Sequence, residues 1–281
     1  MSFIQVVLLG MVQGFAELLP VSSSAHVVVA EKLMRLDPTA PEHTFLLVML
    51  HLGTMLAVLV YFRKRWANRL RGPHARLFLS SVIIATIATG AVGLALKHVL
   101  ENVILPRVLG ADLTEVEQLF GSVTLISTAL AAAGLLIVLA GRFERRAQRS
   151  SLSNSVSLTV GVVQGLCLPF RGFSRSGATI STALLARIDR ALAEDFSFAL
   201  AVLLTPPVIY LELRRYMKAA GTFAGVHFGP AMLGMMASLL AGLVALRWLS
   251  SWLERGRWAS FGYYCLVASA ALLVMQASGF V

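Results

Sequence analysis

The sequence has few cysteines and few charged residues, and both shortages restrict what the protein can be. Only two of its 281 residues are cysteines, Cys167 and Cys265, and each lies inside an apolar stretch. Neither a disulfide framework nor a thiolate metal site is therefore supported. Charged residues make up 14% of the chain, against about 25% in soluble domains. Together with 57% hydrophobic residues and a mean hydropathy of +0.78, this composition predicts an integral membrane protein.

Acidic residues are scarcer than basic ones, and the formal charge at pH 7 is +10. Such an excess can indicate nucleic-acid binding, but here Lys and Arg are bunched in short segments between apolar runs. Membrane topology explains that pattern better, so we expect no nucleic acid among the partners. The N-terminal run has no basic n-region and no cleavage site, and it is expected to belong to the mature fold. We predict a single membrane domain, residues 1–281.

Six apolar runs are long enough to cross a hydrocarbon layer of about 30 Å as helices. They cover residues 44–62, 77–99, 119–141, 196–213, 224–246 and 259–279. Two further stretches, 3–34 and 154–186, are apolar but are interrupted by Pro, Gly, Ser and charged residues. We predict that these are re-entrant helix pairs, because non-helical backbone at membrane depth must be buried in protein or line a wet cavity. The predicted fold is an all-α integral membrane protein with six transmembrane helices plus two re-entrant helix pairs.

The basic segments orient these helices by the positive-inside rule. The rule places in the cytoplasm the segments 63–76, 142–149, 187–194 and 247–258. The acidic segment 100–118 then falls outside, as does 213–223, whose basic residues count against the scheme. In this orientation the two re-entrant pairs enter from opposite sides, which predicts an inverted repeat of approximately 1–141 and 154–281. Such repeats bind their ligands near the midplane of the membrane, where broken helices meet.

The two interrupted stretches contain similar polar segments. One begins at Gly10 and reads GMVQGFAELLPVSSSAH, and the other begins at Gly161 and reads GVVQGLCLPFRGFSRSGAT. Both share G-x-V-Q-G and then continue into hydroxyl residues. Because polar groups are costly at membrane depth, we expect the two segments to build one site from two halves.

Gln13 and Glu17 lie four residues apart, so on a helix they share a face and could hold one divalent cation or one water. The structural alternative is a packing hydrogen bond from Gln13 and a salt bridge from Glu17. A carboxylate within an apolar helix is nevertheless a functional-site candidate by default, because an unpaired charge there costs several kcal/mol.

Hydroxyls and an imidazole follow Pro20 and open the next helix. These residues are Ser22, Ser23, Ser24 and His26. Ser23 and His26 could pair as nucleophile and base, or they could bind phosphate oxygens together with free backbone N–H groups. Ordinary N-capping needs one serine and no histidine, so the functional interpretation is favoured.

The second segment carries the strongest signal, a phosphate cradle. Its candidate substrate-binding residues are Arg171, Gly172, Ser174, Arg175, Ser176, Gly177 and Thr179. The glycines would let the backbone approach a ligand, and Arg175 offers a fork of donors for phosphate oxygens. The alternative is an arginine that snorkels beside a helix cap. Arg171 and Arg175 would repel each other unless Glu17 or an anion compensates them, so a multiply charged ligand is expected.

These segments resemble the motifs of the bacterial undecaprenyl-pyrophosphate phosphatases, also called bacitracin-resistance proteins. Residues 13–17 are similar to their (E/Q)xxxE element, 19–26 to L-P-V-S-S-[ST]-[GA]-H, and 172–179 to P-G-x-S-R-S-G-x-T. Further similarity at 50–54 and 194–200 extends the resemblance over nearly the whole chain. It implies hydrolysis of a C55 isoprenoid pyrophosphate to the monophosphate carrier that cell-wall synthesis recycles. It also implies a divalent cation, Mg²⁺ or Ca²⁺, and a place in the bacterial inner membrane.

The resemblance also implies roles for single residues. Glu17 would be the essential carboxylate for metal binding or proton transfer, with Gln13 beside it. Ser23 would be the candidate nucleophile and His26 its base or the acid for the leaving group, although which of the two attacks phosphorus stays open. Arg175 would hold the pyrophosphate. The residues assisting it would be Ser174, Ser176 and Thr179.

Two positions depart from the family pattern. Arg171 stands where a proline is expected before Gly172, and Leu47 stands where an acidic residue is common, four positions before His51. We expect these departures to affect metal geometry and lipid preference rather than the class of reaction. His51 itself is expected to be a packed helix residue.

A transporter or flippase of phosphorylated polyprenyl lipids is the alternative function, because an inverted repeat around a midplane anion site is transporter architecture. A small-anion channel is a weaker possibility. The joint presence of Glu17, Ser23 and His26 favours the phosphatase, since anion transport has little use for a carboxylate beside Arg175. We expect the active site to face the extracytoplasmic side. The expected partners are a polyprenyl pyrophosphate lipid and membrane lipids, with a homodimer as one assembly to consider.

Overall fold

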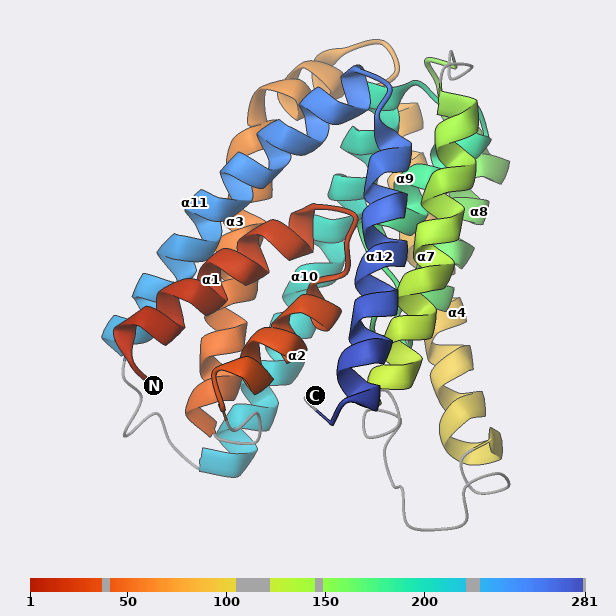
Figure 1. Ribbon diagram of the computed structural model, residues 1–281. Coiled ribbons are helices and arrows are strands. Elements are labelled where there is room, and N and C mark those ends of the chain that lie inside the picture. Colours follow the sequence, from red (N-terminus) through yellow and green to blue (C-terminus); the bar gives the residue numbers. More distant parts are fainter. Residues whose placement is uncertain (37–40, 105–121, 145–148, 221–227, 280–281) are drawn as a thin grey trace.

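A computed structural model of the chain describes residues 1–36, 41–104, 122–144, 149–220 and 228–279 (Figure 1). Its elements are α1 (Phe3–Leu18), α2 (Ser23–Leu33), α3 (Pro41–Arg71), α4 (Ala75–Val99), the π-helix η1 (Leu100–Ile104), α7 (Val123–Phe143), α8 (Asn154–Cys167), α9 (Arg175–Leu185), α10 (Arg190–Ala220), α11 (Phe228–Glu254) and α12 (Trp258–Ala277). Within these described ranges the elements are all helical, apart from one isolated bridge between Arg149 and Ile188. The predicted all-α class is confirmed.

Six segments are long and apolar enough to cross a membrane. They are His43–Arg71, Ala75–Asn102, Val123–Phe143, Arg190–Lys218, Phe228–Glu254 and Trp258–Ala277. All six predicted spans are thereby confirmed, although parts of 119–141 and 224–246 lie outside the described residues. Helix α3 continues nine residues past the predicted end at residue 62. Hydropathy marks where a helix leaves the lipid, and basic residues continue the same helix beyond that point.

The helix ends that carry the basic segments gather at one end of the molecule. In Figure 1 the last turns of α3, α7 and α11 and the first turn of α12 lie together at the top. The α8–α9 pair begins and ends at this end of the molecule. There the backbone N–H of Arg149, before α8, donates to the carbonyl of Arg187, after α9. The α1–α2 pair closes at the opposite end, where Gln5 Nε2 donates to the Met34 carbonyl over 3.3 Å.

The repeated G-x-V-Q-G segments serve helix packing. Helix α1 lies on α11, and α8 lies on α4. A Cβ at Gly14 would come within 2.5 Å of the Ser238 carbonyl oxygen, and one at Gly161 within 2.4 Å of the Ala85 carbonyl oxygen. Only glycine permits such close backbone approach between membrane helices. Each segment therefore fixes one short helix against a long one.

Large aromatic side chains fill the interior between the long helices. Phe62 of α3, Phe196 and Phe198 of α10 and Trp258 of α12 are each fully buried. The Phe62 and Phe198 rings stack with centroids 5.1 Å apart. This packing ties α3 and α10 together and gives the short helix pairs a rigid support.

Candidate active site

The site forms where the two short helix pairs turn back. Helix α1 ends at Leu18 because Leu19 is extended and Pro20 follows it, and α2 then begins at Ser23. On the other pair, Ser174 caps α9 by accepting a hydrogen bond from the Gly177 backbone N–H over 3.2 Å. Both turns therefore end in a helix N-terminus, which favours negative charge.

Glu17 and Arg175 join the two turns directly. Arg175 Nη2 lies 2.7 Å from Glu17 Oε1, across 158 positions of sequence. The side chains are 22% and 16% exposed for Arg175 and Glu17, so the pair is neither deeply buried nor free in solvent. The expectation that two distant segments bring an acid and a guanidinium together agrees with this geometry.

The second oxygen of Glu17 is surrounded by polar groups of its own helix pair. Ser23 donates its hydroxyl to Glu17 Oε2 over 2.5 Å, and Gln13 Nε2 donates to the same oxygen over 3.4 Å. The short contact from Ser23 is a charge-assisted hydrogen bond, the stronger kind. Glu17 is thus placed to accept a proton from Ser23.

A cavity of about 240 Å³ opens beside this cluster. The sequence-predicted residues on its wall are Glu17, Ser22, Ser23, Ser24, Arg171, Ser174, Arg175 and Ser176. Arg171 is exposed there, and within the described part of the chain no acidic side chain forms an ion pair with it. Two arginines thus face one carboxylate, and an excess of positive charge remains for an anion.

Three predicted residues of the second segment support the cradle instead of lining the cavity. Gly172 has a φ of +99°, and a Cβ there would come within 2.2 Å of the Ile126 carbonyl oxygen of α7. A Cβ at Gly177 would come within 2.9 Å of the Ile137 side chain, also in α7. Thr179 bonds the Arg175 carbonyl over 3.0 Å and the Ser197 hydroxyl over 2.6 Å. These contacts hold the start of α9, and with it Arg175, against α7 and α10.

Two predicted residues of the first segment also lie off the cavity wall. Gln13 is 2% exposed and reaches the site only through Glu17. His26 turns its ring away from Ser23: its Nδ1 lies 2.8 Å from the Ser22 carbonyl oxygen and its Nε2 2.6 Å from the Tyr264 hydroxyl. The structure therefore brings Ser23 to Glu17, and it brings His26 to α12.

Several wall residues were not singled out from the sequence as site residues. His51 was expected to be a packing residue, yet it lines the cavity, with Nδ1 2.8 Å from the Leu47 carbonyl oxygen. The other such residues are Ala16, Cys167, Leu168, Phe170, Phe173, Thr205 and Val208. Thr205 and Val208 flank the Pro206–Pro207 pair inside α10. The apolar members give the cavity a wall suited to a lipid.

The side chains at the site can supply only a small donor set for a metal. No group of three or more His, Cys, Asp and Glu residues that could hold a metal occurs among the residues described by the structure. Among the described residues that line the cavity, Glu17 is the one carboxylate, with serine hydroxyls beside it. Magnesium commonly binds through one or two carboxylates plus substrate phosphates, and this donor set fits that mode.

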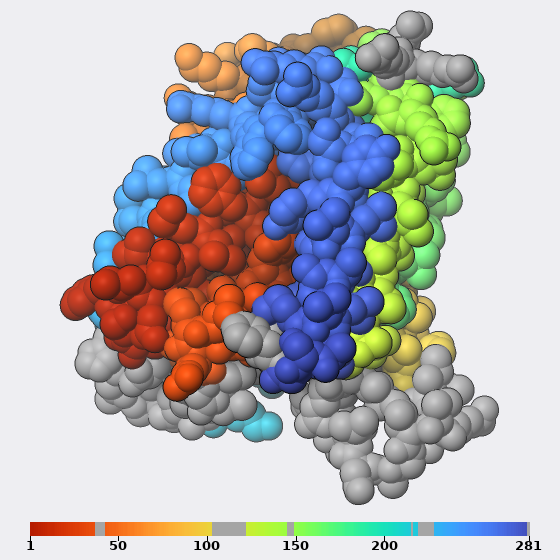
Figure 2. All heavy atoms as spheres, in the orientation of Figure 1, coloured from red at the N-terminus to blue at the C-terminus, as the bar shows by residue number. Residues whose placement is uncertain are grey.

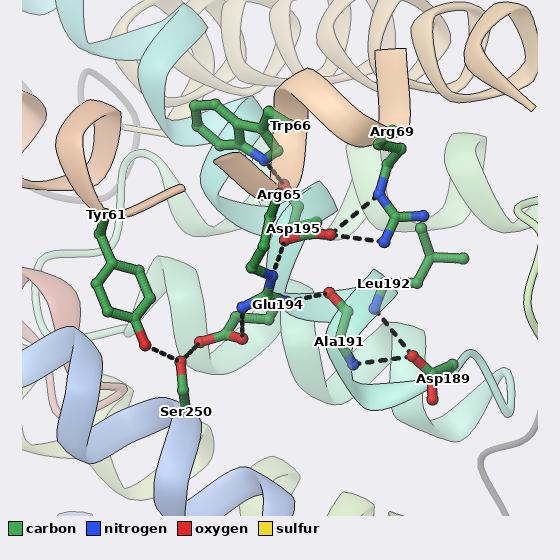
Figure 3. Close-up of polar contacts among 10 residues, drawn as sticks. All are labelled: Tyr61, Arg65, Trp66, Arg69, Asp189, Ala191, Leu192, Glu194, Asp195 and Ser250. Atoms are coloured by element: carbon green, nitrogen blue, oxygen red, sulfur yellow. Dashed lines mark hydrogen bonds and ion pairs between the residues drawn. The ribbon is translucent and has the colours of Figure 1, made fainter. Parts of the chain in front are cut away.

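A second set of ion pairs lies between α3 and α10 (Figure 3), and none of its residues lines the cavity. Arg65 Nη1 is 2.8 Å from Glu194 Oε2, and its Nε is 2.9 Å from Asp195 Oδ1. Arg69 Nη2 is 2.6 Å from Asp195 Oδ2. The Ser250 hydroxyl donates to Glu194. We call these five residues, Arg65, Arg69, Glu194, Asp195 and Ser250, the α3–α10 cluster.

Comparison with known proteins gives a consistent result. The family model described as bacitracin resistance protein BacA matches residues 6–271. An undecaprenyl-diphosphatase 2 of Acinetobacter baylyi is 49% identical, over 98% of this chain and 98% of the relative. An undecaprenyl-diphosphatase of Carboxydothermus hydrogenoformans is 32% identical over 99% of both chains. An undecaprenyl-diphosphatase 1 of Burkholderia pseudomallei is 35% identical over 95% of both.

Proposed function

The chain belongs to the family of the bacitracin resistance protein BacA, and we propose that it works through Glu17, Ser23 and Arg175. The predicted family and activity are confirmed: it is a multi-pass protein of the bacterial inner membrane that hydrolyses undecaprenyl diphosphate to undecaprenyl phosphate. The observation that carries the proposed mechanism is the contact of Glu17 with both Arg175 and Ser23 at the cavity wall.

The diphosphate binds in the cavity, where Arg175 and Arg171 face it. The guanidinium of Arg175 offers several N–H donors, so it can keep one on Glu17 and turn others to the phosphoryl oxygens. The N-termini of α2 and α9 add backbone donors and positive dipole ends. These groups stabilise the charge that develops on the terminal phosphoryl group in the transition state.

Ser23 attacks the terminal phosphorus. A bond forms between Ser23 Oγ and phosphorus, the bridging P–O bond breaks, and undecaprenyl phosphate departs. The serine proton passes to Glu17 Oε2, to which the hydroxyl is already bonded at 2.5 Å. Glu17 then gives this proton to an oxygen of the departing undecaprenyl phosphate and is again a carboxylate.

Water completes the reaction. It attacks the phosphoserine, and Glu17 accepts one of its protons. The bond between phosphorus and Ser23 Oγ breaks, Ser23 recovers its proton from Glu17, and inorganic phosphate leaves. One carboxylate thus serves both halves of the reaction.

A divalent cation, Mg²⁺ or Ca²⁺, would be held by Glu17 and the substrate phosphates, with Gln13 orienting the carboxylate through its amide. When bound, such a cation neutralises charge on the phosphoryl oxygens.

The two short helix pairs are proposed to be re-entrant and to belong to inverted repeats, 1–141 and 154–281. The packing supports this, because each short pair lies on a long helix of the other repeat: α1 packs on α11, and α8 packs on α4. We also propose that the cavity opens to the extracytoplasmic side. The α3–α10 cluster lies between α3 and α10 at their basic ends, which we assign to the cytoplasm. Thr205, which lines the cavity, is ten residues beyond Asp195, or about 15 Å further along α10 toward the opposite side. Transport of phosphorylated polyprenyl lipids, the alternative function, is not favoured.

Phosphate release from a C55 or C15 isoprenyl diphosphate by the purified protein in detergent tests this mechanism. Ser23→Ala should lower kcat by at least about a thousandfold, because it removes the nucleophile. Ser24→Ala is the matched control on the same wall, and its loss should be about tenfold or less. Acid quenching of the wild type with labelled substrate should trap label on Ser23.

The mechanism predicts two further results with the same purified protein. Activity with Mg²⁺ should fall when a chelator is added, and Ser23→Ala should bind substrate as tightly as the wild type. If Ser23→Ala turns over at the wild-type rate, water attacks directly and the serine step is wrong, while the family activity stands.

A further inference from the structure

We infer that Tyr264 of α12 is a positioning residue that acts through His26 on the turn that carries Ser23. The inference rests on the proposed function, in which Ser23 is the nucleophile and Glu17 its base. It gives His26 a different role from the one that the family resemblance implies, because here the imidazole does not exchange protons with the substrate.

The hydrogen bonds of His26 fix its tautomer. Nδ1 lies 2.8 Å from the Ser22 carbonyl oxygen, and a carbonyl can only accept, so Nδ1 carries the proton. In the neutral ring Nε2 then accepts the Tyr264 hydroxyl proton over 2.6 Å. The two rings also stack, with centroids 5.7 Å apart and planes 13° from parallel. Both ring nitrogens are therefore occupied by protein groups.

The carbonyl that His26 holds belongs to a strained residue. Ser22 has a φ of 68°, which is the left-handed region that side-chain-bearing residues rarely adopt. Such a conformation persists only when surrounding contacts over-determine it. The backbone N–H of His26 also bonds the Ser22 carbonyl, at 3.4 Å, and Ser23 follows directly with its hydroxyl on Glu17. The imidazole thus helps to hold the turn that aims Ser23.

The surroundings of the ring argue against contact with phosphate. A crevice of about 300 Å³ lies on this side of α2, between α2, α7 and α12. Apart from His26 and Tyr264, its lining residues are apolar: Ala25, Val29, Leu130, Val267, Ala268, Ala271 and Leu272. The arginines and serines that would bind phosphate line the other cavity. Figure 2 shows α2 and α12 side by side on the front face of the molecule.

Substitutions that copy one ring nitrogen at a time test the inference in the phosphate-release assay. The amide nitrogen of asparagine takes the place of Nδ1, and that of glutamine takes the place of Nε2. His26→Asn should therefore lose about threefold to fivefold in kcat, the loss expected from the missing Tyr264 contact alone, whereas His26→Gln and His26→Ala should lose about tenfold or more. The pH profile of His26→Asn should keep the wild-type shape, because no titrating imidazole takes part.

Tyr264→Phe should lower kcat about threefold to fivefold with KM unchanged, because it removes one hydrogen bond. Tyr263→Phe, the neighbouring exposed tyrosine, is the control and should behave as the wild type. In the His26→Asn background Tyr264→Phe should have no further effect, because the shorter side chain no longer reaches the hydroxyl.

A folded His26→Asn that is as inactive as His26→Ala, or that loses one limb of the pH profile, would overturn the inference and make His26 an acid or base. A Tyr264→Phe that equals Tyr263→Phe would remove Tyr264 from the chain of contacts. Glu17→Gln is measured in the same assay as a test of the proposed mechanism. Full activity in that variant would refute the proposed mechanism itself, whatever the His26 variants do.

Discussion

Among the described residues, ion pairs join the two predicted repeats at two places, and the carboxylates at these two places differ in burial. At the cavity, Arg175 and Glu17 are 22% and 16% exposed. In the α3–α10 cluster the carboxylates of Glu194 and Asp195 are 3% and 1% exposed. The arginine-paired carboxylates therefore lie at a cavity wall in one place and are buried in the other, while the arginines of the cluster, Arg65 and Arg69, are 33% and 26% exposed and are no more buried than Arg175.

The two places also differ in charge balance. The α3–α10 cluster sets Arg65 and Arg69 against two carboxylates. Its Ser250 hydroxyl donates to Glu194, and Tyr61 donates its hydroxyl to Ser250. On the described part of its wall, the cavity sets two arginines against one carboxylate, that of Glu17. A balanced, buried cluster has no capacity left for a ligand, whereas an unbalanced one at a cavity attracts an anion. Burial and balance, rather than residue type, therefore separate a structural cluster from a binding site.

Matched carboxylate substitutions should separate these roles most strongly. Glu17→Gln should lower kcat about a thousandfold, because the amide cannot accept the Ser23 proton, and should leave the melting temperature close to that of the wild type. Glu194→Gln should leave kcat of the folded protein within about twofold. It should lower the melting temperature by about 6 to 12 °C, since breaking a buried pair costs about 3 kcal/mol.

Phosphate release and thermal unfolding in the same detergent measure both effects on each variant. The comparison fails if the two variants lose activity in equal measure while both remain folded. Such a result would mean that the α3–α10 cluster takes part in turnover.

Arginine-to-lysine substitutions should give the next largest effects. Arg175→Lys keeps the charge but loses the planar fork, so kcat should fall about a hundredfold with little change in stability. Arg65→Lys cannot reproduce the contacts to Glu194, Asp195 and the Ala191 carbonyl. It should lower the melting temperature by a few degrees and leave kcat unchanged. Equal kcat values for Arg175→Lys and the wild type would show that charge alone suffices at the cavity.

Much of the fold could be predicted because its main determinant, the length of each apolar run, can be read directly from the sequence. Six apolar runs produced six spans, since a helix that crosses lipid needs about 20 apolar residues whatever it packs against. The breaks after Leu18 and after Cys167 could also be predicted, because proline, glycine and serine interrupt apolar sequence there. Helix ends beyond the lipid, such as that of α3 at Arg71, carry no hydropathy signal.

The site could be predicted only in part. Glu17, Ser23 and Arg175 stand out because charge and hydroxyl groups are rare in apolar sequence, and the structure brings them together. The direction of the His26 ring depends on Tyr264, 238 positions away, and no local pattern encodes that contact. Likewise, Gly172 lies against the backbone of α7, and no local pattern encodes that contact.

Arg171 offers the smallest and most specific test of the charge balance at the cavity. It is exposed on the wall and stands where the family pattern has proline. Arg171→Gln should raise KM about fivefold, or about 1 kcal/mol, with kcat unchanged, because an exposed cation contributes screened binding. The increase should shrink as salt is added. Arg142→Gln, an exposed arginine at the end of α7, is the control and should match the wild type at every ionic strength. If KM of Arg171→Gln equals that of Arg142→Gln at low salt, Arg175 alone supplies the positive charge that the diphosphate meets.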